Sequence, residues 1–251
     1  IKTEYKNKDL VIKMIKLKEK LKKCKNMKEK AKKMKNYFAG ETCYILSCGP
    51  SFNQHSIEEI KKNTSNGIVF TIKQNYPQLQ DVADFHFING TNYISYSHLP
   101  YTITSYSYTT YGSKDPTTIL LSRKHDLQFL IDKKLGNLSK SHMFEDFQIL
   151  KSLTRPMGPG IMYETVIHLA VLLGFKKIKI LGWDLTVGNQ YQHMTGYVNT
   201  NHIMESDIIK EQNAIIKSTQ TLYHWLKEQN ISLFILSHES RVWKKIPRIK
   251  W

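Results

Sequence analysis

The sequence lacks several features that would assign it to a class of protein at once. No apolar run reaches the roughly 18 residues of a membrane span, and no signal-peptide pattern is present. There is neither an Asp-x-Asp element, which often holds the divalent cation of a nucleoside diphosphate, nor a Gly-x-Ser-x-Gly nucleophile turn. His193 and His202 have no acidic or thiol pair that would complete a zinc site with them. These absences argue against a membrane-spanning protein, a Ser-His-Asp hydrolase and a metal centre.

Cysteine is also scarce, with Cys24, Cys43 and Cys48 scattered in the first part of the chain. Cys43 and Cys48 lie five positions apart on one predicted strand, so their side chains should face opposite sides of the sheet and cannot form a disulfide. Reduced thiols are typical of a cytoplasmic protein, and we expect that location.

Positive charge is abundant and unevenly placed. The formal net charge is +16. Lysine is concentrated in the first 35 residues, while the remainder of the chain is only mildly basic. The sequence therefore predicts a basic amphipathic helix over residues 1–38 and one domain over residues 39–251. One stripe of this helix is apolar at spacings of three and four, with Leu10, Met14, Leu17, Leu21, Cys24 and Ala31.

Three interpretations of the basic helix compete. The apolar stripe could dock on the domain or on a twin helix of a homo-oligomer, lie on an anionic membrane, or belong to a nucleic-acid arm. The segment has no arginine and few aromatic residues to contact bases, so a nucleic-acid partner is not expected. We expect a peripheral membrane protein, held by this helix and by a basic, aromatic C-terminus.

Strand and helix patterns alternate along the rest of the chain, which predicts an α/β fold with a Rossmann-like, doubly wound, mostly parallel sheet. The stretch 91–111 is rich in Tyr, Ser and Thr and is interpreted as an edge hairpin or a flap. The candidate strands are 43–47, 68–72, 85–88, 118–121, 178–181 and 233–236, and helical patterns include 56–62, 127–134, 160–173 and 205–229.

Small and polar residues follow several of these strands, where open α/β sheets bind ligands. A turn of small residues at a helix start offers backbone N–H groups and a helix dipole to a phosphate, although a tight strand-to-helix turn with no ligand has the same sequence. Amide side chains after the next two strands could contact a base or a ribose. The candidate nucleotide-binding residues are Gly49, Pro50, Ser51, Gln74, Asn89, Gly158, Pro159, Gly160 and Asp184.

The segment after Asp184 concentrates Tyr191, His193 and His202. A lone histidine in a loop is usually just solvated. Two histidines beside a predicted ligand edge suggest that one is a general base, because histidine alone has an unperturbed pKa near 6.5.

In motif order, residues 43–238 resemble the bacterial sialyltransferases of glycosyltransferase family 42. The likeness rests on Gly49-Pro50-Ser51, the helix from Gly160 that ends at Leu173-Gly174-Phe175, the strand that ends at Gly182-Trp183-Asp184, and His202 followed by Asp207 and a helix. The turn also occurs in the motility accessory factors and in archaeal hydroxymethylpterin diphosphokinases.

This resemblance implies a Rossmann-like enzyme that moves an acidic sugar from a CMP donor to a glycan hydroxyl, with inversion and with no metal or other cofactor. It places the catalytic base on His202 and a phosphate-contacting tyrosine on Tyr191. Two positions depart from the family: Lys73 replaces an asparagine, where its ammonium could stabilise the phosphate or the donor carboxylate, and Thr186 replaces a tyrosine. Sialic acid and related ulosonic acids such as Kdo therefore both remain open.

Two other functions would each account for part of the sequence. A pterin diphosphokinase would bind ATP and Mg²⁺, but acidic residues are scarce at the predicted strand ends. A non-enzymatic nucleic-acid-binding protein would explain the charge but not the polar residues at the strand ends.

Overall fold

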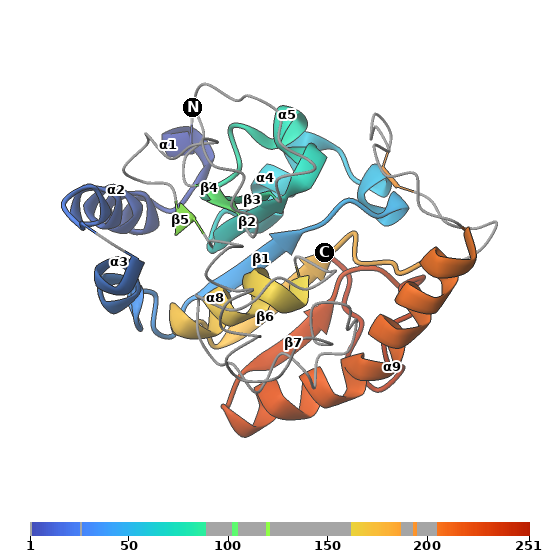
Figure 1. The fold of residues 1–251 in the computed structure, drawn as a ribbon. Helices are drawn as coiled ribbons and strands as arrows, with labels where there is room; N and C mark the ends of the chain where they lie inside the picture. The colour runs from blue at the N-terminus through green and yellow to red at the C-terminus, as the bar shows by residue number, and fades with distance from the viewer. Residues whose placement is uncertain are drawn as a thin grey trace, which may run out of the picture.

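The computed structural model describes residues 2–25, 27–88, 102–104, 119–120, 162–186, 193–194 and 205–251. Its centre is a seven-stranded sheet in the order β5-β4-β3-β2-β1-β6-β7, in which every neighbouring pair is parallel (Figure 1). The strands are β1 (Thr42–Leu46), β2 (Ile68–Ile72), β3 (Phe85–Ile88), β4 (Thr102–Thr104), β5 (Ile119–Leu120), β6 (Lys177–Leu181) and β7 (Ser232–Ile235). The expected Rossmann-like α/β fold is confirmed.

The strand order reverses between β1 and β6. From β1 the chain adds β2 to β5 in one direction, and it then returns to the other side of β1 for β6 and β7. Ligands of open α/β sheets bind outside the carboxyl ends of the strands at such a switch point.

Helices cover both faces of the sheet. The helices α8 (Ile167–Leu172) and α9 (Glu205–Glu228) pack on one face, and α4 (Ile57–Thr64) and α5 (Tyr76–Leu79) pack on the other (Figure 1). Cys43 belongs to the first hydrophobic cluster and Cys48 to the second, and both are free thiols. The prediction that these two side chains face opposite sides of the sheet is confirmed.

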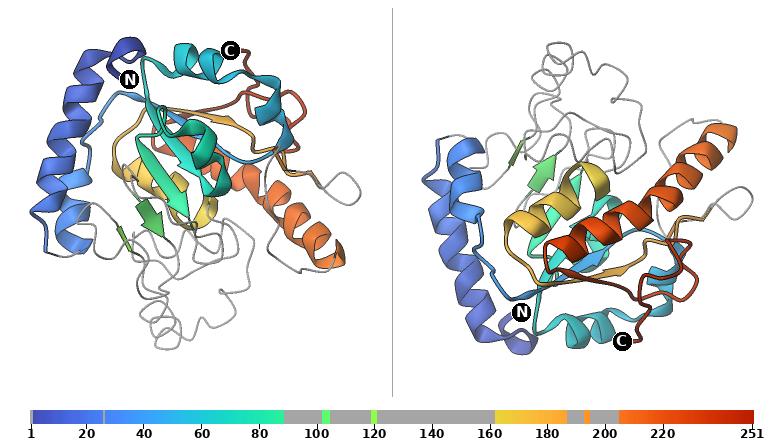
Figure 2. Two further views of the ribbon diagram at one scale, coloured as in Figure 1. Left: turned by 90° about the horizontal axis from the view of Figure 1, so that it is seen from above. Right: turned by 90° about the horizontal axis from the view of Figure 1, so that it is seen from below.

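The N-terminal segment is a chain of short helices rather than the single helix that we expected. It comprises α1 (Lys2–Tyr5), α2 (Lys8–Lys22) and α3 (Met27–Met34), and α2 and α3 lie side by side along one flank of the molecule (Figure 2). A straight helix over 38 residues would be about 57 Å long and would overhang the domain. Turning back after α2 instead lets Met34 and Phe38 enter the core.

The apolar stripe of α2 docks on the domain. Its four buried members, Leu10, Met14, Leu17 and Leu21, belong to the same hydrophobic cluster as strand residues such as Ile45 and Phe70. The docked-helix alternative is therefore the one that the structure shows, and this stripe cannot insert into a membrane.

A buried ion pair reinforces this docking. The Lys6 ammonium contacts the Asp84 carboxylate, and the two side chains are 1% and 3% exposed. The same carboxylate accepts a hydrogen bond from the backbone N–H of Val69 at 2.8 Å, and the Tyr5 hydroxyl donates to the Asp81 carbonyl at 2.7 Å. Lys6 and Tyr5 thereby attach the N-terminal residues to β2 and to the turn before β3.

Backbone hydrogen bonds also hold the connection from α3 to β1. The N–H groups of Asn36, Phe38 and Gly40 donate to the carbonyls of Leu172, Leu173 and Gly174, at 2.8, 2.8 and 3.2 Å. Asn36 and Gly40 both have positive φ angles, of 56° and 85°, which these two residue types tolerate well. Residues 36–40 thus form an ordered turn against the end of α8.

The C-terminal segment folds back on the domain. The Arg248 guanidinium donates hydrogen bonds to the carbonyls of Ser240, Val242, Trp243 and Ile246. The last ring, that of Trp251, lies 6.3 Å from the ring of Tyr44 and 5.1 Å from that of His55. Arg248 and Trp251 thus both make contacts inside the fold, and the expectation that the C-terminus faces a membrane stays a prediction.

The stretch 91–111 was expected to be an edge hairpin or a flap. Its only described part, β4, is a parallel strand between β3 and β5, so the hairpin interpretation is wrong for residues 102–104. Within the described residues, no helix is both long and apolar enough to cross a membrane.

Candidate functional site

The turns that follow β1 and β6 meet at the switch point. After β1 the chain enters the short helix η1 (Pro50–Gln54), and the N–H of Gly49 donates to the carbonyl of Gly182 at 2.7 Å. Ser51 donates twice to Asp184, from its backbone N–H to Oδ2 and from its hydroxyl to Oδ1, at 2.7 Å each. Three of the predicted nucleotide-binding residues therefore lie together, namely Gly49, Ser51 and Asp184. Ser51 and Asp184 are hydrogen-bonded to each other.

The close approach of the two turns explains the glycine at position 49. A Cβ atom built there would lie 2.4 Å from both the Gly182 carbonyl oxygen and Asp184 Oδ2, although the φ angle of −72° suits any residue. Glycine is required by contact with protein atoms. The turn therefore needs a small residue at this position whether or not it binds a ligand, and the Ser51 N–H already donates to the Asp184 carboxylate.

The C-terminal segment makes two hydrogen bonds to the turn that contains Asp184. The Ser240 hydroxyl donates to the Trp183 carbonyl at 2.6 Å, and the N–H of Arg241 donates to the Asp184 carbonyl at 3.0 Å. These residues were not selected from the sequence, because spacing along the chain gives no sign of contacts over more than 50 positions.

Strained backbone marks the same edge of the sheet. Four described non-glycine residues have positive φ angles, and two of them, Asn36 and Asn230, are of a type that tolerates this conformation. The other two are Lys73 (51°), directly after β2, and Leu185 (54°), after β6. Such strain costs of order 1–3 kcal/mol and is concentrated at functional sites. Lys73 is therefore a candidate functional residue.

Two buried side chains fix the path of the chain around Lys73. The Asn75 amide donates to the Leu46 carbonyl at the end of β1, and its oxygen accepts from the Ile72 N–H at 3.0 Å. The Cys48 thiol donates to the Ile72 carbonyl at 3.0 Å. The sequence pointed to Gln74 rather than to Asn75, although both residues follow β2.

The positive charge of Lys73 acts on titratable groups from three other segments. Burial raises the pKa of the Cys48 thiol to about 11, and Lys73 and the backbone N–H groups of Asn75 and Gln74 act to lower it. Burial also raises the pKa of the Glu211 carboxyl, again opposed by Lys73. Glu211 lies near the start of α9, and the start of α9 reaches the same end of the molecule as η1 (Figure 1).

Of the two histidines predicted near this edge, His193 is the one that the structure describes. Burial lowers its pKa to about 4, the positive charge of Lys73 adds to that effect, and a hydrogen bond to the backbone of Cys48 opposes it. The next residue, Met194, donates its N–H to the Cys48 carbonyl at 2.7 Å. The imidazole of His193 is therefore neutral at pH 7 and held against the β1 turn.

The other predicted site residues divide into two groups. Among the described ones, Pro50 is the first residue of η1, Gln74 is buried in the turn after β2, and Thr186 is half-buried two residues beyond Asp184. Asp207 is exposed in the first turn of α9, 3.8 Å from Lys210. The remaining ones lie outside the described residues: Tyr191, His202, Asn89, Gly158, Pro159 and Gly160.

Among the described residues, no group of three or more His, Cys, Asp or Glu side chains could hold a metal ion. Both oxygens of Asp184 already accept hydrogen bonds from Ser51.

The fold and this edge define a Rossmann-like α/β protein with a polar site at its switch point. A family model described as 6-hydroxymethylpterin diphosphokinase MptE-like matches residues 17–190, more than half of the chain, and the chain belongs to this family. No curated protein and no solved structure matches the chain. The family's description names a transferase, in agreement with the prediction of a transferase, while the finer resemblance to glycosyltransferase family 42 remains a prediction.

Proposed function

We propose that the protein is an inverting, metal-independent glycosyltransferase that moves an acidic sugar, sialic acid or a related ulosonic acid such as Kdo, from a CMP donor to a glycan hydroxyl. The observation that carries the proposal is the position of Lys73. Lys73 follows β2 at the switch-point edge with a strained backbone, and its positive charge acts on the pKa values of Cys48, His193 and Glu211.

One ammonium suits a leaving group with one phosphate. The charge that develops on CMP as the glycosidic bond breaks can be stabilised by a fixed cation in a site shielded from water, without a divalent ion. The Ser51 N–H is occupied by Asp184, so Lys73 is the better candidate for this phosphate. Gln74, Asn89, Thr186, Tyr191 and the Gly158–Gly160 turn remain proposed donor contacts.

The acceptor hydroxyl needs a base with a pKa near the working pH. The pKa of His193, about 4, makes this residue a weak base at neutral pH. This value supports His202 as the proposed general base and gives His193 the role of holding the segment after Asp184 against the β1 turn.

The test measures release of CMP from CMP-sialic acid and from CMP-Kdo by chromatography, with a panel of glycan acceptors and with EDTA present throughout. Because binding to the native state stabilises it, CMP should also raise the melting temperature of the protein. Absence of both a thermal shift at millimolar CMP and any CMP release would refute the proposal.

A variant of Lys73 locates the phosphate. Lys73→Met should weaken CMP binding roughly 10- to 100-fold, the loss typical of a hydrogen bond to a charged group. Lys227→Met is the matched control, because Lys227 is exposed in the last turn of α9, at the far end of that helix from Glu211. Equal CMP affinity of both variants and the wild-type chain would remove Lys73 from the site.

The family match favours a second candidate, transfer of a diphosphate from ATP to a hydroxymethylpterin. In that reaction Lys73 would contact the phosphates of ATP, and Mg²⁺ would be required. Release of AMP from ATP and a hydroxymethyldihydropterin, lost in EDTA and restored by Mg²⁺, would select this candidate over the first.

A further inference from the structure

The outward face of α2 carries a stripe of exposed side chains that take no part in docking the helix on the domain. Opposite the buried stripe, positions 8, 12, 15, 16, 19, 22 and 23 follow one another at helical spacing and form a second stripe. We call this the outer stripe; its members are Lys8, Ile12, Ile15, Lys16, Glu19, Lys22 and Lys23.

Ile12 and Ile15 lie in the middle of the outer stripe, 47% and 58% exposed. Among the described residues they are the two exposed large hydrophobic side chains, and they are neighbours on one helix. Single apolar side chains on a surface are ordinary, but two adjacent ones between lysines form an amphipathic surface.

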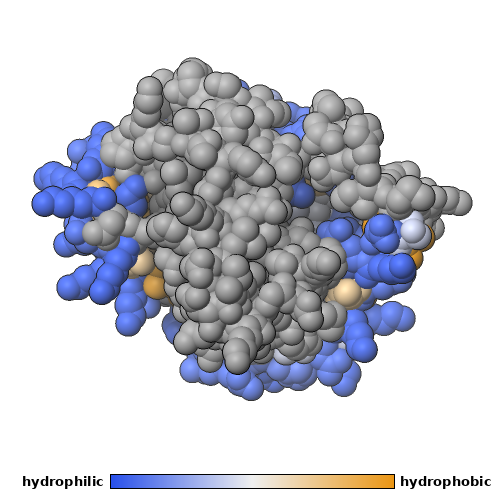
Figure 3. Space-filling model, in the orientation of Figure 1, coloured by the Kyte–Doolittle hydropathy of each residue, from blue (hydrophilic) through white to orange (hydrophobic). Residues whose placement is uncertain are grey.

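The surroundings of the outer stripe are strongly cationic. Its one acidic member, Glu19, is 3.0 Å from Lys22, which partly offsets its charge. Further exposed lysines line the turn after α2 and the neighbouring helix α3, namely Lys25, Lys28, Lys32, Lys33 and Lys35. Hydrophilic side chains project from this flank in Figure 3.

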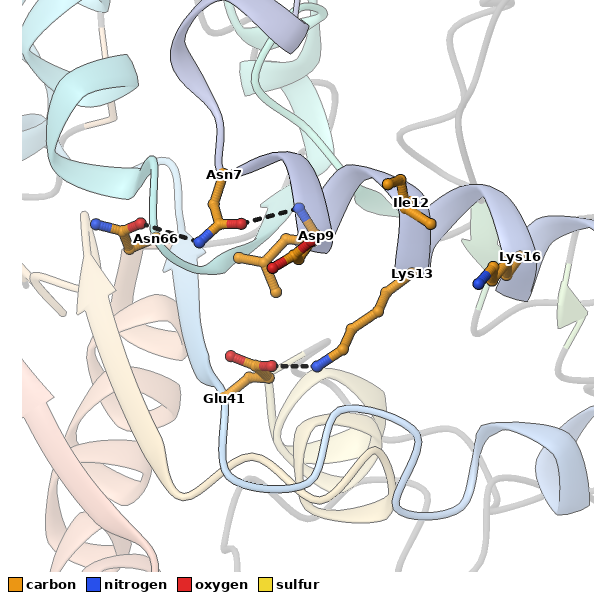
Figure 4. A pocket seen from close by; sticks show the side chains of 8 residues that line it. Asn7, Asp9, Ile12, Lys13, Lys16, Glu41 and Asn66 are labelled. Carbon is orange, nitrogen blue, oxygen red and sulfur yellow. Dashed lines mark hydrogen bonds and ion pairs between the residues drawn. The ribbon is translucent and has the colours of Figure 1, made fainter.

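A hollow of about 390 Å³ opens beside the outer stripe, between α2 and the start of β1 (Figure 4). Its lining includes Ile12 and Lys16 but also the carboxylates of Asp9 and Glu41, and Glu41 pairs with Lys13. An anion in this hollow would meet two carboxylates, so the hollow itself is not an anion site. The exposed stripe is the feature that fits a negatively charged partner.

We propose that the outer stripe of α2, with the lysines of α3, binds an anionic lipid membrane. The lysines meet the headgroups, while Ile12 and Ile15 enter the boundary between headgroups and acyl chains. A nucleic acid would use the lysines but would gain nothing from the two isoleucines. The two isoleucines therefore favour a membrane over a nucleic acid as the partner of this surface.

The position of the outer stripe also sets the orientation of the protein. The helices α2 and α3 lie at the end of the molecule opposite to η1 and the start of α9 (Figures 1 and 2). On a membrane, the switch-point edge would therefore face the solution. The proposed acceptor would reach the site from that side rather than from within the lipid surface.

The test is co-sedimentation of the full chain with two kinds of vesicle, pure phosphatidylcholine and phosphatidylcholine with a quarter of phosphatidylglycerol. The wild-type chain should bind the anionic vesicles, release them at high salt, and bind the neutral ones weakly. Equal binding to both vesicles, or none to either, would overturn the proposal.

Two double variants separate the parts of the surface. Lys16→Glu/Lys23→Glu should weaken binding at least about 25-fold, since each lysine near an anionic surface contributes about fivefold. Ile12→Ser/Ile15→Ser should weaken it roughly tenfold for each side chain that is partly buried in lipid. Lys244→Glu/Lys245→Glu is the control, because both lysines are exposed in the C-terminal segment and should leave binding within about twofold.

One pattern of results identifies a different partner. If the isoleucine variant binds vesicles as the wild-type chain does, while a double-stranded oligonucleotide displaces both proteins equally, the surface is a general polyanion site and the membrane proposal fails. Circular dichroism melting of each variant confirms that the compared proteins are folded, and the lysine and isoleucine variants test the proposal independently.

Discussion

The buried pair of Lys6 and Asp84 allows a quantitative test of how the N-terminal helices are held. Lys6→Met removes the ammonium and leaves the Asp84 carboxylate, 3% exposed, with its Val69 hydrogen bond but without its counter-charge. Breaking a buried ion pair in this way costs about 3–5 kcal/mol, a large part of the 5–15 kcal/mol that stabilises a typical domain.

Urea unfolding followed by circular dichroism and by tryptophan fluorescence measures this cost. With a dependence of the unfolding free energy on urea of about 3 kcal/mol per molar, the midpoint should fall by about 1–1.7 M. Lys8→Met is the control, because Lys8 is exposed two positions further on and should change stability by less than about 0.5 kcal/mol.

A second substitution completes the cycle. Lys6→Met/Asp84→Asn removes both charges, so it should be less destabilised than the sum of the two single variants, by about 0.5–3 kcal/mol. If Lys6→Met unfolds at the same urea concentration as the wild-type chain, the N-terminal helices are an independent appendage and the reasoning is refuted.

Three further predictions concern the sheet and the site. Burial lowers the pKa of His86 to about 3, so below pH 6.5 the unfolded chain takes up a proton that the native state does not; this histidine alone should lower stability by about 2 kcal/mol at pH 5, and urea titrations should show a flatter pH dependence for His86→Asn. Gly49→Ala places a Cβ against Asp184 and should cost at least about 2 kcal/mol in thermal unfolding, whereas an unchanged melting temperature would contradict the close contact. His202→Ala should lower kcat by about 10²- to 10⁴-fold with donor affinity little changed, and His193→Ala should cost much less; the opposite ranking in steady-state assays would exchange their roles.

Most of the sheet could be predicted from the sequence, because its strands are short apolar runs that end in Gly or polar residues. The predicted ranges of β1, β2, β3, β6 and β7 agree with the structure to within one residue at each end. The strand β4 was missed, since Thr102–Thr104 lies in a stretch of Tyr, Ser and Thr in which the apolar pattern is weak. Its place in the sheet comes from long-range pairing with β3 and β5.

The stripe of α2 could be recognised from the sequence, but its partner could not. Helical spacing identifies Leu10, Met14, Leu17 and Leu21 as one face, and any apolar surface would cover such a face equally well. The pair of Lys6 and Asp84, 78 positions apart, gives no local pattern that would identify the partner as the chain's own sheet.

The site was predicted in part. Gly49, Ser51 and Asp184 were selected as ligand contacts, and the structure brings them together, but as partners of one another over 133 positions. Lys73 was noticed only as a departure from a family pattern. Its importance comes from the backbone angle and from Glu211 on a distant helix, which only the folded chain reveals.

The hydrogen bonds between the 36–40 turn and the end of α8 have a mechanical consequence. The carbonyls of Leu172, Leu173 and Gly174 are held by N–H groups of the segment that leads from α3 into β1. A hydrogen bond weakens within a few tenths of an ångström of its best length, so α8 cannot slide along its axis without pulling on this segment. A displacement of the end of α8 would therefore also displace the 36–40 turn, which leads back to α3.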